Sequence, residues 1–155
     1  MGYRFSPIRG KESLLEAVVY VATTTAELAR KIIGKSFPIR SLTVFSHDQS
    51  EYEGLIEILS EMGAPYDENN GPRITLHQPI VVGDNTITHL RIRKSDPDRP
   101  QVGCSDIKTD YEKFKDEYLA KCLDNLRLIK RSTYEMIELF DPEYDVLAYV
   151  VSLEK

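Results

Sequence analysis

The stretch from Thr86 to Gly103, TITHLRIRKSDPDRPQVG, most constrains the fold of this chain, because it predicts a strand, a connector and a second strand. Side chains of a strand alternate between two faces, so Leu90 and Ile92 should face a core. Ile87 falls on the opposite face. Two prolines within Ser95–Gln101 then end the strand, since prolines at that spacing do not fit a strand interior. The basic residues that share the opposite face are His89, Arg91 and Arg93.

This basic face has two interpretations. It is either a solvated sheet surface, which is the more common situation, or a site for an anion. A guanidinium fork matches the geometry of a carboxylate or a phosphate, which favours the second interpretation as a hypothesis of function. The candidate ligand-binding residues are therefore His89, Arg91 and Arg93.

Composition limits the classes of function. The chain has 155 residues, a net charge of −5, 41% hydrophobic residues and 29% charged residues, as expected for one soluble globular domain. An acidic balance disfavours general binding to nucleic acid. No apolar run approaches the ~20 residues that span a bilayer, and the first residues lack the apolar core of a signal peptide. Cys104 and Cys122 form neither a metal-binding spacing nor a disulfide framework. We therefore expect a cytoplasmic protein with no membrane or nucleic-acid partner.

Periodicity predicts the elements before the connector. Apolar residues recur every three or four positions in Lys11–Ile33, which predicts a helix that ends at Gly34 and is weakened, kinked or broken at Thr23–Thr25. Ser50 and Glu53 have the spacing of a capping box and predict a second helix. The other predictions for this half are a strand at Ser41–His47, a helix end near Met62, a loop at Ala64–Pro72, and strands at Arg73–Val82 and Thr86–Lys94.

The same scheme starts again after the connector. A strand at Val102–Lys108 leads to a second capping box at Thr109 and Glu112, and its helix should end near Cys122. The three strands predicted to follow are Leu126–Lys130, Tyr134–Phe140 and Asp145–Leu153.

The two halves indicate an internal repeat. The capping boxes begin at residues 50 and 109, which are 109 − 50 = 59 residues apart, and the same offset places Leu90 on Tyr149 and Ile92 on Val151. We therefore expect an α+β fold of two tandem βαβββ-like units with a mixed or antiparallel curved sheet. The boundaries are an N-terminal helical extension at 1–40, a first unit at 41–95 and a second unit at 96–155, in one compact domain.

Two such units in tandem resemble the vicinal oxygen chelate superfamily, which includes glyoxalases, bleomycin-resistance proteins and extradiol dioxygenases. Near the end of the chain, Asp141-Pro142-Glu143 is similar to the family's closing hairpin, although Tyr144-Asp145 replaces its Gly-Asn. The resemblance covers about 41–153 and leaves out the N-terminal helix.

The resemblance implies a fold without the family's metal chemistry. Metal ligands in that family usually lie on the first and last strands of each unit, which the resemblance here places near Ala148 and His89 on the last strands, and near Thr43/Val44 and Val102–Cys104 on the first strands. Of the first-strand residues, Cys104 is the one that could bind a metal. Alanine cannot bind a metal, and one histidine with one cysteine does not complete the usual set of three protein ligands. We therefore expect no metal and no cofactor. Metal-free members bind small molecules, often as dimers, so the resemblance also implies a possible homodimer.

Three hypotheses of function follow. The first is a small-molecule binding protein that holds an anionic ligand. The second is a divergent metal-dependent lyase, isomerase or dioxygenase that uses His89 with Cys104 or Glu138. The third is a protein-interaction or inhibitor module that uses the Lys11–Ile33 helix or a sheet edge as its contact surface. The sequence leaves open the identity of the ligand, whether the histidines His47, His77 and His89 meet, the oligomeric state, and the role of the N-terminal helix.

Overall fold

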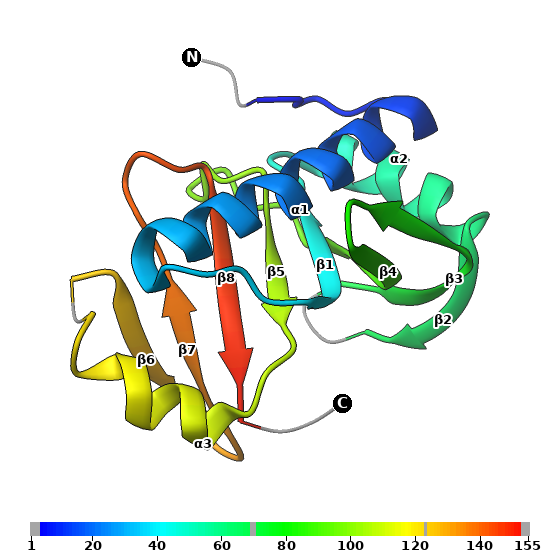
Figure 1. Ribbon diagram of the computed structural model, residues 1–155. Coiled ribbons are helices and arrows are strands. Elements are labelled where there is room, and N and C mark those ends of the chain that lie inside the picture. The colour runs from blue at the N-terminus through cyan, green and yellow to red at the C-terminus, as the bar shows by residue number, and fades with distance from the viewer. Residues whose placement is uncertain (1–3, 69–70, 123, 153–155) are drawn as a thin grey trace.

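The computed structural model describes residues 4–68, 71–122 and 124–152 of the chain (Figure 1). The fold is α+β, with helices packed against one eight-stranded mixed sheet. The helices are α1 (Lys11–Ile33), α2 (Gln49–Ser60) and α3 (Tyr111–Phe114), which continues into a π-helical turn (Lys115–Leu119). The strands are β1 (Ile39–Phe45), β2 (Gly63–Asp67), β3 (Arg73–Val82), β4 (Asn85–Arg93), β5 (Gly103–Ile107), β6 (Leu126–Lys130), β7 (Glu135–Leu139) and β8 (Val146–Val151).

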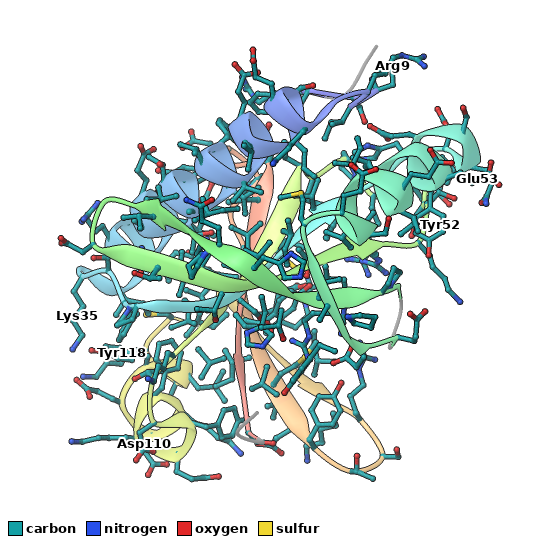
Figure 2. The ribbon with its side chains drawn as sticks, turned by 90° about the vertical axis from the view of Figure 1, so that its right-hand side faces the viewer. Arg9, Lys35, Tyr52, Glu53, Asp110 and Tyr118 are labelled. Carbon is teal, nitrogen blue, oxygen red and sulfur yellow. The ribbon has the colours of Figure 1, made fainter. Side chains whose placement is uncertain are left out.

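The sheet has the strand order β2-β3-β4-β1-β5-β8-β7-β6. β1 pairs parallel with β4, β5 pairs parallel with β8, and β1 and β5 pair antiparallel at the centre. Outward from this central pair, the order is β1-β4-β3-β2 on one side and β5-β8-β7-β6 on the other. Figure 2 shows how strongly the sheet twists, since the green strands β3 and β4 run across the view while β7 and β8 run from top to bottom. It also shows α2, marked by Tyr52 and Glu53, and α3, marked by Asp110, at opposite ends of the molecule.

Helix α1 covers the central strands. Its observed bounds confirm the predicted helix, and Gly34 ends it in a left-handed conformation that a residue with a side chain rarely adopts. The predicted weak point at Thr23–Thr25 does not interrupt the helix. Thr25 is buried, and its hydroxyl lies 2.9 Å from the hydroxyl of Ser105 on β5. Packing against the sheet therefore outweighs the low helix propensity of these threonines.

One face of the sheet carries the core, and the helices pack on this face. Its strand residues include Leu42, Leu90, Ile137 and Ala148, which are each no more than 1% exposed, and Leu90 faces the core as predicted. At the central pair, Gly103 allows β1, β5 and α1 to approach closely. A Cβ atom there would lie 2.2 Å from the carbonyl oxygen of Thr43 and 3.0 Å from Cγ2 of Val21.

The alternation is broken in β4. Ile87 was expected on the basic face, but it is fully buried in the same core as Leu90 and Ile92. The β3–β4 register shifts between the pairs Thr75–His89 and Ile80–Ile87, so the strand turns its side chains over within this interval. The prediction for Ile87 is therefore wrong, because a bulge changes the face on which it lies.

The helix caps also differ from the predictions. The side chain of Asp48, not Ser50, caps α2 by accepting a hydrogen bond from the amide of Glu51 at 2.8 Å. Asp110 caps α3 in the same way, with Lys113 as the donor. These caps are 110 − 48 = 62 residues apart, so the 59-residue offset does not align the two helices. Strand β2 was predicted as loop and is a further difference.

Candidate functional site

The predicted basic residues lie on the face of the sheet opposite the helices, which we call the open face. In the pairing of β4 with β1, His89 is opposite Ser41 and Arg91 is opposite Thr43. Arg93 is opposite Phe45, and its guanidinium carbon lies 5.2 Å from the centre of that aromatic ring. Strand pairing thus brings His89, Arg91 and Arg93 onto one surface.

Asp67 at the end of β2 joins two arginines of neighbouring strands. Its carboxylate accepts hydrogen bonds from Nε and Nη2 of Arg73 at 3.1 and 2.5 Å, and another from Nη2 of Arg91. Burial alone would raise the pKa of Asp67, but the hydrogen bonds and charges of Arg73 and Arg91 outweigh it and lower that pKa. The carboxylate is therefore ionised at neutral pH and is shared by two cations.

His89 lies beside this arginine pair. The ring of Tyr66 packs edge-on against His89, with ring centres 4.7 Å apart, and also lies 4.9 Å from the guanidinium carbon of Arg73. Burial lowers the pKa of His89, and the positive charge of Arg73 lowers it further. His89 is consequently a neutral imidazole at pH 7, which can exchange hydrogen bonds with a ligand without adding a charge.

The open face continues across β5, β8 and β7 with different chemistry. Cys104 lies opposite Thr43, and burial raises the pKa of its thiol to about 12. The hydroxyl of Tyr149 donates a 2.8 Å hydrogen bond to Glu138, which is 6% exposed. Cys104 is therefore a protonated thiol at neutral pH, and a thiolate is the form that attacks electrophiles or binds metals.

Glu138 and its neighbour Glu135 lie on opposite faces, as their three-residue spacing predicts. Glu135 is on the helix side, where its carboxylate accepts hydrogen bonds from the hydroxyl of Tyr111 at 2.5 Å and from Lys115 at 2.7 Å. The two carboxylates therefore do not form a paired acid–base site.

The three histidines occupy separate places. His89 is opposite Ser41 in the middle of the sheet, whereas His47 follows the end of β1 and is buried beside Glu51. His77 is exposed on β3. Within the described residues, no group of three or more histidine, cysteine, aspartate or glutamate side chains is placed to hold a metal ion.

Sequence reasoning missed the residues of β2 and β3 that surround the predicted basic residues, namely Tyr66, Asp67 and Arg73. Tyr66 and Asp67 lie in β2, a short strand of sequence GAPYD whose glycine and proline are typical of loops. Arg73 was placed correctly in a strand, but its ion pair depends on β2, so no signal in the sequence indicated that Arg91 would share a carboxylate with it.

Comparisons with known proteins add information about the fold. No family model matches the chain, and no curated protein matches it. A solved structure described as structural genomics protein EC4020 is similar, with a TM-score of 0.60 and 13% sequence identity over 92% of each chain. At this identity the likeness shows a shared fold alone. Among the described residues, no helix has the length and apolar character needed to cross a membrane.

Proposed function

We propose that this chain consists of two tandem βαβββ-like units of glyoxalase-like build and binds a small anionic ligand on its open face, without metal chemistry. The matching strand orders on the two sides of the central β1–β5 pair support the first part. The single observation that carries the second part is the charge balance on the open face of β3 and β4, where two arginines share the carboxylate of Asp67 and a third, Arg93, lies over Phe45.

The charge balance leaves an excess of two positive charges. Arg73 and Arg91 share one carboxylate, that of Asp67, and Arg93 follows Arg91 by two residues on the same face of β4. Arg93 has an aromatic ring beside it and, among the described residues, no ion-pair partner within 4.0 Å. The next carboxylate across β1 is that of Asp106, which accepts a 3.0 Å hydrogen bond from Ser41. An arginine that is held on an aromatic ring and is not neutralised is well placed to bind a carboxylate or a phosphate.

The neighbouring groups define what the ligand should look like. Neutral His89 supplies a hydrogen-bonding edge, and Thr43 lies between Arg91 and Cys104. We expect a ligand with one strongly anionic group near Arg93 and hydrogen-bonding groups that extend toward the middle of the sheet. Because the site contains no thiolate and no carboxylate pair for acid–base work, binding is favoured over catalysis.

Thermal unfolding with inorganic phosphate, sulfate and citrate tests this proposal. An anion at ten times its Kd should raise the Tm by about 3–6 °C, because only the folded protein binds it. Arg93→Ala should abolish the shift. Arg127→Ala is the matched control, since Arg127 is opposite Glu138 on the same face but in the other half of the sheet. A shift of equal size in a variant that carries both Arg91→Ala and Arg93→Ala would rule out this site.

A further inference from the structure

A cleft runs between α1 and the turn that joins β7 to β8, and we call it the α1 cleft. It consists of two adjoining hollows with volumes of about 520 and 620 Å³. Tyr20, Glu143 and Tyr144 line both hollows, so the two share a wall. Each volume is in the range of small-molecule sites. The cleft is separate from the proposed anion site, because Arg91 and Arg93 line neither hollow.

The α1 cleft is acidic. The carboxylates that line it belong to Glu16, Glu27, Asp141, Glu143 and Asp145. Two cations pair with these five groups, since Arg4 contacts Asp145 and Lys31 contacts both Asp141 and Glu143. Three negative charges are therefore left over. Glu16 and Glu27 are exposed along α1, so the cleft favours a ligand with positive charge.

One carboxylate of the cleft is already arranged around a guanidinium. Asp145 accepts a 2.8 Å hydrogen bond from Nε of Arg4 on one oxygen and a 2.5 Å hydrogen bond from the Tyr20 hydroxyl on the other. The guanidinium carbon of Arg4 lies 4.9 Å from the centre of the Tyr20 ring. Burial would raise the pKa of Asp145, but the hydrogen bonds from Tyr20 and Arg4 outweigh it and lower that pKa. Asp145 and Tyr20 thus present an ionised carboxylate and an aromatic face to one cation.

Arg4 is a weakly held occupant of this place. Its side chain is 57% exposed. The rest of the segment 4–10 is anchored independently, because Ile8 is 3% exposed and the ring of Phe5 packs edge-on against that of Tyr20, with ring centres 5.4 Å apart. The guanidinium of Arg4 can therefore leave its place while the segment stays attached.

Gln101 gives independent evidence that a hydrogen-bond donor suits this cleft. It lines the same hollow as Arg4, Tyr20 and Asp145. Its side-chain oxygen is buried and, among the described residues, has no hydrogen-bond partner. Buried acceptors are normally paired, and guanidinium and ammonium groups carry donors only. An N–H group of a ligand beside Asp145 would supply the partner.

We propose that the α1 cleft binds a small organic dication whose guanidinium or ammonium head contacts Asp145 and Tyr20, and that Arg4 competes internally for the same place. The second cationic group is drawn to Glu16 and Glu27, which line the hollow that also contains Tyr20. Glu16 lies four residues before Tyr20 and Glu27 seven residues after it, which is about 6 and 10 Å along the helix axis. A short aliphatic chain spans such a separation.

Titration with agmatine, a guanidinium joined to an ammonium group by four methylenes, tests this proposal by NMR at constant ionic strength. Agmatine should shift the resonances of Tyr20 and Asp145. Arg4→Ala should lower the Kd about fivefold, the usual contribution of an exposed ion pair with a cation–π contact. Arg9→Ala is the matched control, because it removes the same charge from the same segment, and Arg9 points away from the molecule (Figure 2). Its Kd should equal that of the wild type.

The matched probe is 4-guanidinobutanoate, which has the same head but a carboxylate at the other end. It should bind at least about tenfold more weakly than agmatine, because the cleft repels its carboxylate. Asp145→Asn combined with Arg4→Ala should abolish binding of agmatine. Nuclear Overhauser effects between the agmatine methylenes and the Tyr20 ring locate the ligand in the unsubstituted protein, even if that double variant does not fold.

Four results would each overturn the proposal. The first is a lack of agmatine binding to both the wild type and Arg4→Ala, and the second is a Kd that Arg4→Ala leaves unchanged. The third is equal binding of agmatine and 4-guanidinobutanoate. The fourth is a set of Overhauser effects that places agmatine away from Tyr20.

Discussion

Replacement of Asp67 by Asn removes the carboxylate that Arg73 and Arg91 share. Asn keeps one acceptor oxygen for one guanidinium, but it turns an NH₂ group toward the other. The arginine side chains are 9% and 15% exposed, and that of Asp67 is 30% exposed, so the interaction is only partly screened by water. Hydrogen bonds to charged groups contribute ~1.5–3 kcal/mol each, so after allowance for screening and for the retained acceptor we expect a loss of about 2 kcal/mol.

Urea unfolding followed by far-ultraviolet circular dichroism measures this loss. With an m-value of about 2 kcal/mol/M, the midpoint of Asp67→Asn should fall by about 1 M. Asp84→Asn is the matched control, because Asp84 is exposed in the turn between β3 and β4, and its free energy of unfolding should change by less than about 0.5 kcal/mol. Since the pKa of Asp67 is lowered, its contribution is present above about pH 4 and disappears as the pH falls through the folded value. The difference between the variant and the wild type should therefore shrink in acid.

The same substitution also tests the proposed ligand site. Asp67→Asn raises the net positive charge of Arg73, Arg91, Arg93 and residue 67 from two to three. Sulfate at constant ionic strength should therefore stabilise the variant more than the wild type. At ten times its Kd the anion would restore about 1.4 kcal/mol. An unchanged urea midpoint would refute the proposed contribution of the shared carboxylate to stability. Equal stabilisation of both proteins by sulfate would refute the anion-binding role of the cluster.

Three other predictions concern the fold and its pH response. Gly103→Ala should destabilise the protein by ~3 kcal/mol or more, because the added Cβ would overlap the carbonyl oxygen of Thr43. Urea unfolding measures this loss, and a change below about 1 kcal/mol would contradict the prediction. The free energy of unfolding of the wild type should fall between about pH 7.5 and 5.5, and in His89→Gln it should fall by less. The lowered pKa of this histidine means that the unfolded chain binds more protons, so an unchanged loss in the variant would count against burial as the cause. Asp48→Ala should cost about 1 kcal/mol by loss of the helix cap, whereas Ser50→Ala should cost less than half of that; the reverse order would restore Ser50 as the cap.

The sequence predicted elements well where periodicity was long. The helix Lys11–Ile33 has six turns of regular apolar spacing and a glycine stop, and its observed bounds agree with the prediction. Alternation in β4 also placed His89, Arg91 and Arg93 on one face, because Leu90 and Ile92 carry a strong apolar signal. It failed at Ile87, since the position of a bulge depends on the partner strand and is not encoded locally.

The predicted 59-residue repeat does not hold position by position. Under the 59-residue shift Leu90 coincides with Tyr149, yet Leu90 is buried on the helix side and Tyr149 lies on the open face beside Glu138. The helix caps are 62 residues apart, so loops and bulges of different length separate corresponding elements. Similar strand order in two halves can therefore exist without a constant spacing along the chain.

The path of α1 has a consequence for how a ligand can be recognised. This helix crosses the central β1–β5 pair, contacts β1, β5 and β8, and is tied at its far end by Lys31 to Asp141 and Glu143 (Figure 1). The β1–β5 ladder joins the two sides of the sheet and α1 packs across it, so closure of one side onto the other would break both sets of contacts. If the open face binds a ligand as proposed, selectivity should come from side-chain rotamers, and the bound and free backbones should superimpose closely.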